Sequence, residues 1–167
     1  GPGSDTLLGG PGNDTYVVDT TTDVITENIN EGTDSVHASA TYTLTNNLEN
    51  LTLTGANALD ATGNTLNNLL IGNPANNTLT GNAGNDIIDG GFGTDTAVFS
   101  GNLANYTVVW NISSDSFTIT DTRTTGSTGT DTLRWVENFQ FADQAVAEVR
   151  LARRVLGLER DAARERA

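Results

Sequence analysis

Four consecutive nine-residue units between residues 63 and 98 constrain the fold more than any other feature of this chain. Each unit opens with glycine, has Asn or Asp at its sixth position and carries an aliphatic residue at its eighth. A related unit at residues 9–17 follows the same pattern, and Asp5 and Asp23 lie nine residues before and after its Asp14. Such periodicity is typical of a chain built from stacked, equivalent units. The sixth positions are Asn68, Asn77, Asp86 and Asp95, and the eighth positions are Leu70, Leu79, Ile88 and Ala97.

Each unit is suited to a turn followed by a short strand. Glycine at its head permits positive φ angles and close backbone approach. The last three residues place one apolar side chain between polar or β-branched ones, as in a strand. One inward apolar residue in nine cannot form a core alone, but stacked coils bury a continuous column of such residues. The sequence therefore predicts an all-β fold, a β-solenoid.

The charge of the chain narrows the choice of partners. The net charge is −13, and residues 1–144 hold 17 acidic residues against only Arg123 and Arg134. This acidity argues against nucleic acid and anionic membranes and favours cations, because Asp in turns supplies the oxygen ligands that hard cations prefer. The apolar runs are too short for a membrane-spanning helix. High charge with few aromatic residues is also typical of disorder, and the regular repeat argues against that alternative.

The residue types that carry catalysis are scarce. The chain has no cysteine and a single histidine, His37. This composition excludes a cysteine nucleophile, a thiolate zinc site and disulfides. No Ser-His-Asp pattern stands out, so we expect a protein that is not an enzyme.

The repeats resemble the RTX (repeat-in-toxin) calcium-binding family, whose signature is G-G-x-G-x-D-x-U-x. The units 9–17 and 90–98 match this signature best, and 81–89 follows closely. With a divergent linker and a region that follows the last repeat, the resemblance covers residues 5–143. It implies a right-handed parallel β-roll, with two units per coil. It also implies the C-terminal repeat block of a larger protein, secreted by the type I machinery of a Gram-negative bacterium.

The resemblance also implies where calcium binds. Each ion lies between successive coils and takes two sixth-position side chains, 18 residues apart, together with backbone carbonyls. Asp5 and Asp23 form a pair of two carboxylates, whereas the later pairs combine one carboxylate with one amide. We therefore expect weak or empty sites in turns 63–68 and 72–77, where the amides would hydrogen-bond between coils instead. The expected Ca²⁺ ligands are Asp5, Gly9, Pro11, Asp14, Asp23, Asn68, Asn77, Gly81, Ala83, Asp86, Gly90, Phe92 and Asp95.

The remaining aspartates fit ordinary turns better than metal sites. This interpretation applies to Asp19, Asp34 and Asp131. The roll is expected to end after Asp95, because Ala104 stands nine residues later.

The chain divides into four parts on composition. Residues 1–4 are interpreted as the remnant of a cleaved tag and residues 5–99 as the roll, with a divergent linker at 19–62. Residues 100–143 are interpreted as a β capping region and residues 144–167 as an Arg-rich amphipathic helix. The helix is expected to dock on the acidic roll, and a partner-binding helix or part of a secretion signal are the alternatives.

The capping region is rich in aromatic residues. Alternating apolar and polar positions predict strands at 105–112 and 116–121, and a third strand at 135–141. We expect Trp110 and Trp135 in the core of the cap, and an exposed sugar-binding platform is the alternative.

The sequence thus favours a non-catalytic calcium-binding module of a secreted protein that folds on binding Ca²⁺ outside the cell. Its partners would be calcium ions and, by resemblance, the type I secretion machinery. The alternative is a calcium-stabilised adhesive or carbohydrate-binding module with a polysaccharide partner.

Overall fold

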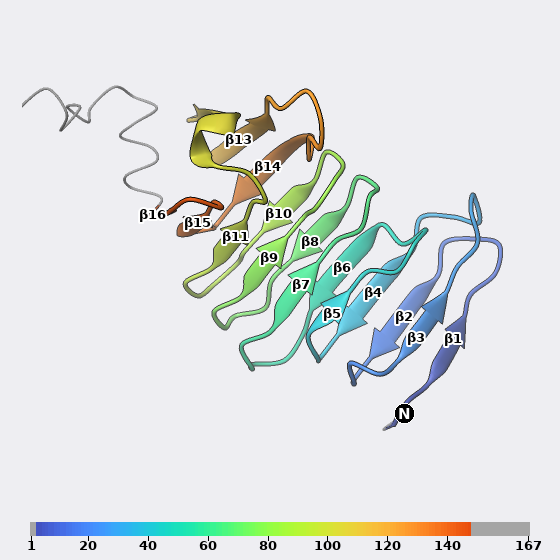
Figure 1. Ribbon diagram of the computed structural model, residues 1–167. Helices are drawn as coiled ribbons and strands as arrows, with labels where there is room; N and C mark the ends of the chain where they lie inside the picture. The colour runs from blue at the N-terminus through green and yellow to red at the C-terminus, as the bar shows by residue number, and fades with distance from the viewer. Residues whose placement is uncertain (1–2, 148–167) are drawn as a thin grey trace, which may run out of the picture.

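The computed structural model describes residues 3–147, which form an all-β structure with a β-solenoid of about five turns (Figure 1). No helix in this part of the chain is long and apolar enough to cross a membrane. The strands up to residue 98 are β1 (Thr6–Leu8), β2 (Thr15–Val18), β3 (Val24–Thr26), β4 (Ser35–Ala38), β5 (Tyr42–Thr43), β6 (Asn50–Leu53), β7 (Asp60–Thr62), β8 (Leu69–Ile71), β9 (Thr78–Thr80), β10 (Ile87–Asp89) and β11 (Thr96–Val98). A 3₁₀ turn, η1 (Leu103–Asn105), precedes β12 (Tyr106–Asn111), β13 (Ser116–Asp121), β14 (Thr130–Arg134), β15 (Asn138–Gln140) and β16 (Ala145–Ala147).

Successive strands of the solenoid alternate between two sheets. One sheet has the order β12-β13-β14-β10-β8-β6-β4-β2 and the other the order β16-β15-β11-β9-β7-β5, while β1 and β3 pair with each other. Within the repeats the strands are parallel and the register advances by 18 residues, so that Leu70 faces Ile88 and Leu79 faces Ala97. Two nonapeptides therefore make one coil.

The divergent linker continues the solenoid with coils of unequal length. Tyr16 pairs with Val36, Val36 with Leu51 and Leu51 with Leu70, which are offsets of 20, 15 and 19 residues. The turns absorb these differences, because the strands keep their parallel register.

The core is a stack of the inward side chains, one from the middle of most strands. Each is buried because the coil above and the coil below cover it. One sheet contributes Val36, Leu51, Leu70, Ile88 and Leu133, and the other contributes Tyr42, Ala61, Leu79, Ala97 and Phe139, all at most 5% exposed.

The expectation that the roll ends after Asp95 is wrong. β14 pairs in parallel with β10 and β15 with β11, so a further coil follows β11. The chain reaches this coil only after an excursion through η1 and the antiparallel hairpin β12–β13, which packs beside β14 (Figure 1). The predicted third strand of the cap was also misplaced: 135–141 contains only β15, and β14 was missed.

The aromatic residues of this region form two clusters. Phe99, Tyr106 and Phe141 lie with ring centroids 5.1–5.4 Å apart. Trp110 packs on Phe117 at 4.6 Å, in agreement with its expected place in the cap. The same expectation is wrong for Trp135, which is 57% exposed.

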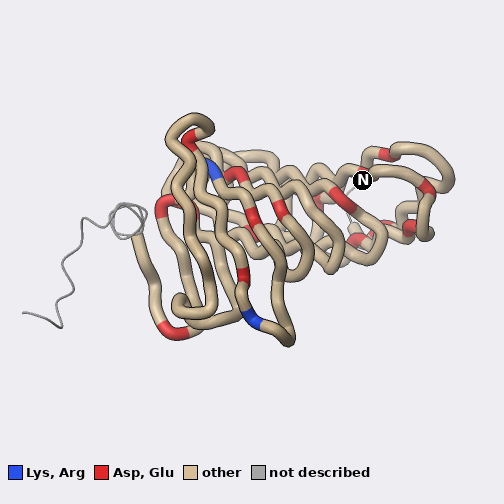
Figure 2. The backbone as a smooth tube through the Cα atoms, turned by 90° about the horizontal axis from the view of Figure 1, so that it is seen from above, with Lys and Arg blue, Asp and Glu red and all other residues tan. Residues whose placement is uncertain are grey.

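The predicted C-terminal helix does not begin at residue 144. Residues 145–147 form β16, which pairs antiparallel with β15, and Asp143 accepts a hydrogen bond from the Leu103 N–H. The rest of the predicted helix lies outside the described residues. Figure 2 shows acidic positions along the whole length of the roll, whereas both described arginines, Arg123 and Arg134, lie at the end formed by β12–β14.

Candidate metal centres

The turns between strands fall into two conformational classes. In the turns 9–14, 81–86 and 90–95, the second and fourth positions both have positive φ angles. In the turns 63–68 and 72–77 no residue has a positive φ. Glycine and asparagine tolerate this conformation best, and they occupy every such position in the first class. The residues with positive φ are Gly10 and Gly12, Asn82 and Gly84, and Gly91 and Gly93.

In the positive-φ turns, the backbone lies close to the sixth-position carboxylate and to the backbone of the neighbouring coil. A Cβ on Gly81 would collide with the carboxylate of Asp86, and one on Gly84 would collide with the carbonyl oxygen of Leu66. A side chain at Gly84 is therefore disfavoured by space as well as by φ, and a side chain at Gly81 by space alone. The cradle around Asp86 is lined closely by backbone.

Each turn of this class holds a carboxylate oxygen that lacks a partner. The buried Oδ2 atoms of Asp14, Asp34, Asp86 and Asp95 accept no hydrogen bond within the described part of the chain. Burial raises the pKa of both Asp86 and Asp95 to about 6, although each also accepts a backbone hydrogen bond that acts the other way. A buried anionic oxygen without a partner is unfavourable, and Ca²⁺, which binds carboxylate and carbonyl oxygens, fits this donor set.

The second class of turn is complete without an ion. Asn68 Oδ1 accepts a hydrogen bond from the Asn64 N–H at 2.8 Å, while its Nδ2 donates to the carbonyls of Leu48 and Glu49 at 3.1 and 3.2 Å. Asn77 repeats this arrangement, with its Oδ1 2.9 Å from the Asn73 nitrogen. The predicted hydrogen bonding between coils is present, but the acceptors are backbone carbonyls of the preceding coil rather than other amides.

A ladder of hydrogen bonds joins the sixth positions along the roll. The backbone N–H of Asn68 donates to Asp86 Oδ1 at 2.8 Å, and Asn77 donates to Asp95 Oδ1 at 2.8 Å. The pairs predicted from the 18-residue spacing are therefore neighbours, and the Asp5 N–H likewise donates to Asp23 Oδ1 at 2.9 Å.

Four further rungs of this ladder were missed at the sequence level. Their offsets are 20, 15, 45 and 42 residues, so a search at 18 residues passes over them. The only sequence signal was the short Asp-x-apolar unit that Asp34 and Asp131 share with the repeats. The missed rungs are Asp14 N–H to Asp34, Asp34 N–H to Glu49, Asp86 N–H to Asp131, and Asp95 N–H to Glu137.

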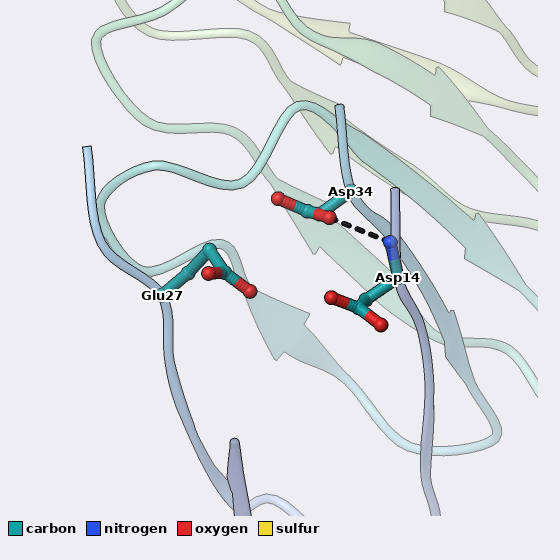
Figure 3. Close-up of side chains that lie close together, drawn as sticks. All are labelled: Asp14, Glu27 and Asp34. Atoms are coloured by element: carbon teal, nitrogen blue, oxygen red, sulfur yellow. Dashed lines mark hydrogen bonds between the residues drawn. The ribbon is translucent and has the colours of Figure 1, made fainter. Parts of the chain in front are cut away.

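The densest group of carboxylates is formed by Asp14, Glu27 and Asp34 (Figure 3). One oxygen from each lies within 4.8 Å of the others, and the Tyr16 hydroxyl donates a hydrogen bond to Glu27. Burial is the main cause of the raised pKa of Tyr16, so the hydroxyl keeps its proton for this bond. Glu27 was not predicted. It stands 18 residues after Gly9, where the repeat would have glycine. It places a third carboxylate beside Asp14 and Asp34.

The predicted pair Asp5 and Asp23 has a different environment. Asp23 Oδ2 accepts hydrogen bonds from the N–H groups of Asp19 and Thr20, at 3.1 and 3.3 Å. The hydrogen bond from the Asp5 N–H is the main cause of the lowered pKa of Asp23. Asp23 therefore differs from Asp86, because protein groups already satisfy its charge.

The other predicted ligands, Gly9, Pro11, Ala83, Gly90 and Phe92, all belong to positive-φ turns. They were proposed as carbonyl donors, and this role remains a prediction. The Phe92 side chain itself is 82% exposed.

Comparison with known proteins finds a match over the nonapeptide units. A sequence model described as the RTX calcium-binding nonapeptide repeat matches four copies, over residues 1–25 and 62–97. No curated protein sequence matches the chain. Among solved structures, the extracellular lipase LipA from Serratia marcescens is similar with 21% identity and a TM-score of 0.30, over 64% of this chain and 19% of that one.

Proposed function

Because the chain carries four RTX calcium-binding nonapeptide repeats, we propose that it is a non-catalytic module that folds when it binds Ca²⁺ outside the cell. The module would belong to a larger secreted protein. Its right-handed roll would support the folding of that protein after export.

One observation carries this proposal: the buried, unpartnered oxygens of Asp14, Asp34, Asp86 and Asp95. Without a cation these carboxylates repel one another and lack the solvation that water gives an exposed carboxylate. A bound ion contributes RT ln(1 + [Ca²⁺]/Kd), which is about 2.7 kcal/mol at 100-fold excess over Kd. Two or three such ions are comparable with the whole stability of a small domain.

The residues that would hold the ions follow from the turn classes. Asp86 and Asp95 would each bind one ion with backbone carbonyls of their turns, and Asp14, Glu27 and Asp34 would share another. The ion would supply positive charge beside these carboxylates, and the chain would supply oxygen ligands and exclude water. The amide turns would need no ion.

The calcium dependence gives a reason for secretion in an extended state. In a cytosol with little free calcium, the acidic chain would stay unfolded and could pass through a narrow channel such as that of the type I machinery. Extracellular calcium, at millimolar concentration, would then fill sites with Kd values of about 10⁻⁴–10⁻³ M. Folding outside the cell would also prevent backward movement.

The test is a calcium titration of the metal-free protein, followed by far-UV circular dichroism and thermal melting. We expect a β-sheet signal that rises with Ca²⁺ and a melting temperature that increases with its concentration, with Mg²⁺ at the same concentration as the control. A fully folded spectrum in excess chelator, with no change in melting temperature on adding Ca²⁺, would exclude the proposal.

A second candidate function is carbohydrate binding, and the surface around Trp135 favours it. This exposed side chain, at φ 54°, borders a pocket of about 260 Å³ that is also lined by Trp110, Asp115 and Glu137. Aromatic faces stack on sugar rings, and carboxylates accept hydrogen bonds from sugar hydroxyls.

A panel of oligosaccharides, titrated against the calcium-loaded protein by calorimetry, tests this candidate. Binding that is lost in Trp135→Ala but kept in Phe92→Ala, which removes another exposed aromatic side chain, is the expected result. The candidate is wrong if no oligosaccharide binds at millimolar concentration, or if both variants bind equally.

A further inference from the structure

Residues 126–134 repeat the nonapeptide pattern at a place where the family match has already ended. The match stops at residue 97. The sequence GSTGTDTLR has Gly126, Gly129, Asp131 and Leu133 at positions one, four, six and eight, and it shares G-T-D-T with residues 93–96. Gly126 lies 36 residues after Gly90, which is four times nine. The hairpin β12–β13 thus lies between the last matched repeat and a displaced one.

The displaced unit takes the place of the next coil in space. β14 extends the sheet beside β10, in parallel register, with Leu133 facing Ile88. Gly126 and Gly129 have φ angles of 67° and 102°, and Leu133 is buried in the core column. The turn 126–131 therefore stacks on the turn 81–86.

Three contacts in this stack reproduce those one coil earlier. Thr130 N–H donates to Asn85 Oδ1 at 2.8 Å, Asp86 N–H donates to Asp131 Oδ1 at 3.0 Å, and a Cβ on Gly129 would collide with the Gly84 carbonyl.

Between turns 63–68 and 81–86, the Asn85 N–H donates to Asn67 Oδ1 at 2.7 Å and the Asn68 N–H donates to Asp86 Oδ1 at 2.8 Å. The Gly84 Cβ position there meets the Leu66 carbonyl. The equivalence of the two interfaces places Asp131 at the sixth position of a repeat.

We propose that Asp131 and Asp86 together bind a divalent cation, Ca²⁺ by their oxygen chemistry, at the junction between the roll and its last coil. The two carboxylates are only 3% and 1% exposed, and Oδ2 of Asp86 is buried without a hydrogen-bond partner. This interface between coils carries two carboxylates, whereas the interface one coil earlier pairs Asp86 with the amide of Asn68. The proposal rests on the proposed function, since it assumes that the positive-φ turn 81–86 takes calcium.

A cation at this junction would link the docking of β14 to calcium. β14 also pairs with β13, so the whole hairpin would be held in place through the same ion. Both tryptophans of the chain, Trp110 and Trp135, lie in this region. Tryptophan fluorescence therefore reports on the cap, while far-UV circular dichroism reports on the strands of the whole roll.

The test compares Asp131→Asn with the unchanged full chain. The amide keeps an acceptor for the Asp86 N–H but removes the charge. We expect calorimetry to show one calcium ion fewer, or one site weakened about tenfold. The calcium midpoint seen by tryptophan fluorescence should rise about tenfold, while the midpoint seen by circular dichroism moves less than threefold. Asp60→Asn, at an exposed position of β7, is the matched control and should change neither midpoint.

The outcomes separate this proposal from the proposed function. If the unchanged chain binds calcium and Asp131→Asn has the same stoichiometry and the same two midpoints, the junction site is wrong while the function stands. If the unchanged chain binds no calcium, the proposed function fails first. A second measurement covers misfolding: in saturating Ca²⁺ the far-UV circular dichroism spectrum of Asp131→Asn should match that of the unchanged chain, and a weaker β-sheet signal there would make Asp131 a structural acceptor and overturn the proposal.

Discussion

The turns 81–86 and 63–68 lie on successive coils and lead into strands that pair in register, β10 and β8. Their backbones nevertheless differ. The first has positive φ at Asn82 and Gly84 and ends in a carboxylate with an unpartnered oxygen. The second has no positive φ and ends in an amide that makes hydrogen bonds with both of its polar atoms. One strand geometry is therefore compatible with two different ways of closing the turn.

The two turns differ in the hydrogen-bond donors that they offer to the sixth-position side chain. In the amide turn, the N–H of Asn64 points at the sixth-position oxygen and satisfies it. In the carboxylate turn, the Asp86 oxygen on the Gly81 side has no such donor. The amide turns in the middle of the roll therefore have their sixth-position polar atoms satisfied by the chain itself, whereas each carboxylate turn on either side keeps a buried oxygen without a hydrogen-bond partner in the described part of the chain.

The largest effect is expected from Gly84→Ala. This change adds a Cβ where φ is 121° and where the Leu66 carbonyl already occupies the space. Backbone strain of about 1–3 kcal/mol combines with overpacking of about 1–3 kcal/mol. We expect the free energy of unfolding in saturating Ca²⁺, from urea titration, to fall by the sum of the two.

Gly12→Ala is the matched control for that prediction. Its φ is 125°, but a Cβ there meets nothing within 4 Å. It should lose only the strain contribution, so the two variants should differ by about 2 kcal/mol. Equal losses would show that the close stacking of coils is not the reason for glycine at position 84.

The fold class and the register of the repeats could be predicted because both follow from a strict period. An 18-residue offset brings Asn68 to Asp86 and Asn77 to Asp95 without further information. The partner of Asp14 could not be found in this way, because the intervening turn has two extra residues and shifts the partner to Asp34.

The end of the roll was mispredicted for a related reason. Sequence distance suggests that a repeat stops when the next period fails, as it does at Ala104. The chain instead inserts the hairpin and returns to the same sheet edge, where β10, paired with β8 on one side, offers the backbone groups of its other edge to β14. The residues one period after the last repeat do not signal such a return. Only the motif at 126–134 does.

A second comparison removes the sixth-position side chain from each class. Asp86→Ala should lower the free energy of unfolding in Ca²⁺ by about 2.7 kcal/mol at 100-fold excess, because one ion is lost. In calcium-free buffer, where the parent chain is expected to be largely unfolded, the same change should have little effect on the β-sheet signal.

Asn68→Ala should act in the opposite way. It leaves the Asn64 N–H without its acceptor and takes from each of the Leu48 and Glu49 carbonyls one of two donors, which costs about 1–3 kcal/mol at any calcium concentration that keeps the chain folded. Urea unfolding of both variants at two calcium concentrations that keep the chain folded gives the four values required. A calcium-dependent loss in Asn68→Ala would contradict the division into two classes.

The pH dependence should also separate the classes. The pKa values of Asp86 and Asp95 are raised to about 6 and that of Asp131 to about 7, mainly by burial, against about 3.9 in an unfolded chain. The folded state therefore binds more protons than the unfolded state between pH 4 and 7. Without calcium the folded state should therefore lose up to about 3 kcal/mol for each of Asp86 and Asp95 as pH rises through this window, so the metal-free chain should regain β-sheet signal in circular dichroism as the pH falls toward 5.

Protons and calcium compete for the same oxygens, so the stabilisation by Ca²⁺ should be larger at pH 7.5 than at pH 5. The pKa of Asp23 is lowered, so this residue changes the stability with pH in the opposite direction. It does so only below its ordinary pKa and leaves the range between pH 4 and 7 unaffected. The calcium midpoint of folding, measured by circular dichroism for the parent chain and for Asp86→Asn from pH 4.5 to 7.5, checks this prediction. The variant should have the shallower slope, and identical slopes would argue against Asp86 as a titrating group.

The smallest effect is expected where an amide turn is given the glycine of the other class. Ala75 stands at the fourth position of turn 72–77, where Gly84 and Gly93 stand in the carboxylate turns. Ala75→Gly removes no hydrogen bond, because the Ala75 N–H can still donate to Asn73 Oδ1, 3.0 Å away. It increases only the freedom of the unfolded chain, so the loss should be about 0.5–1 kcal/mol at every calcium concentration that keeps the chain folded. If Ala75→Gly instead creates a calcium response, for example a calcium-dependent rise in melting temperature above that of the parent, then the fourth-position glycine alone selects the turn class. The sixth-position carboxylate would then not be required, because Asn77 still occupies that place.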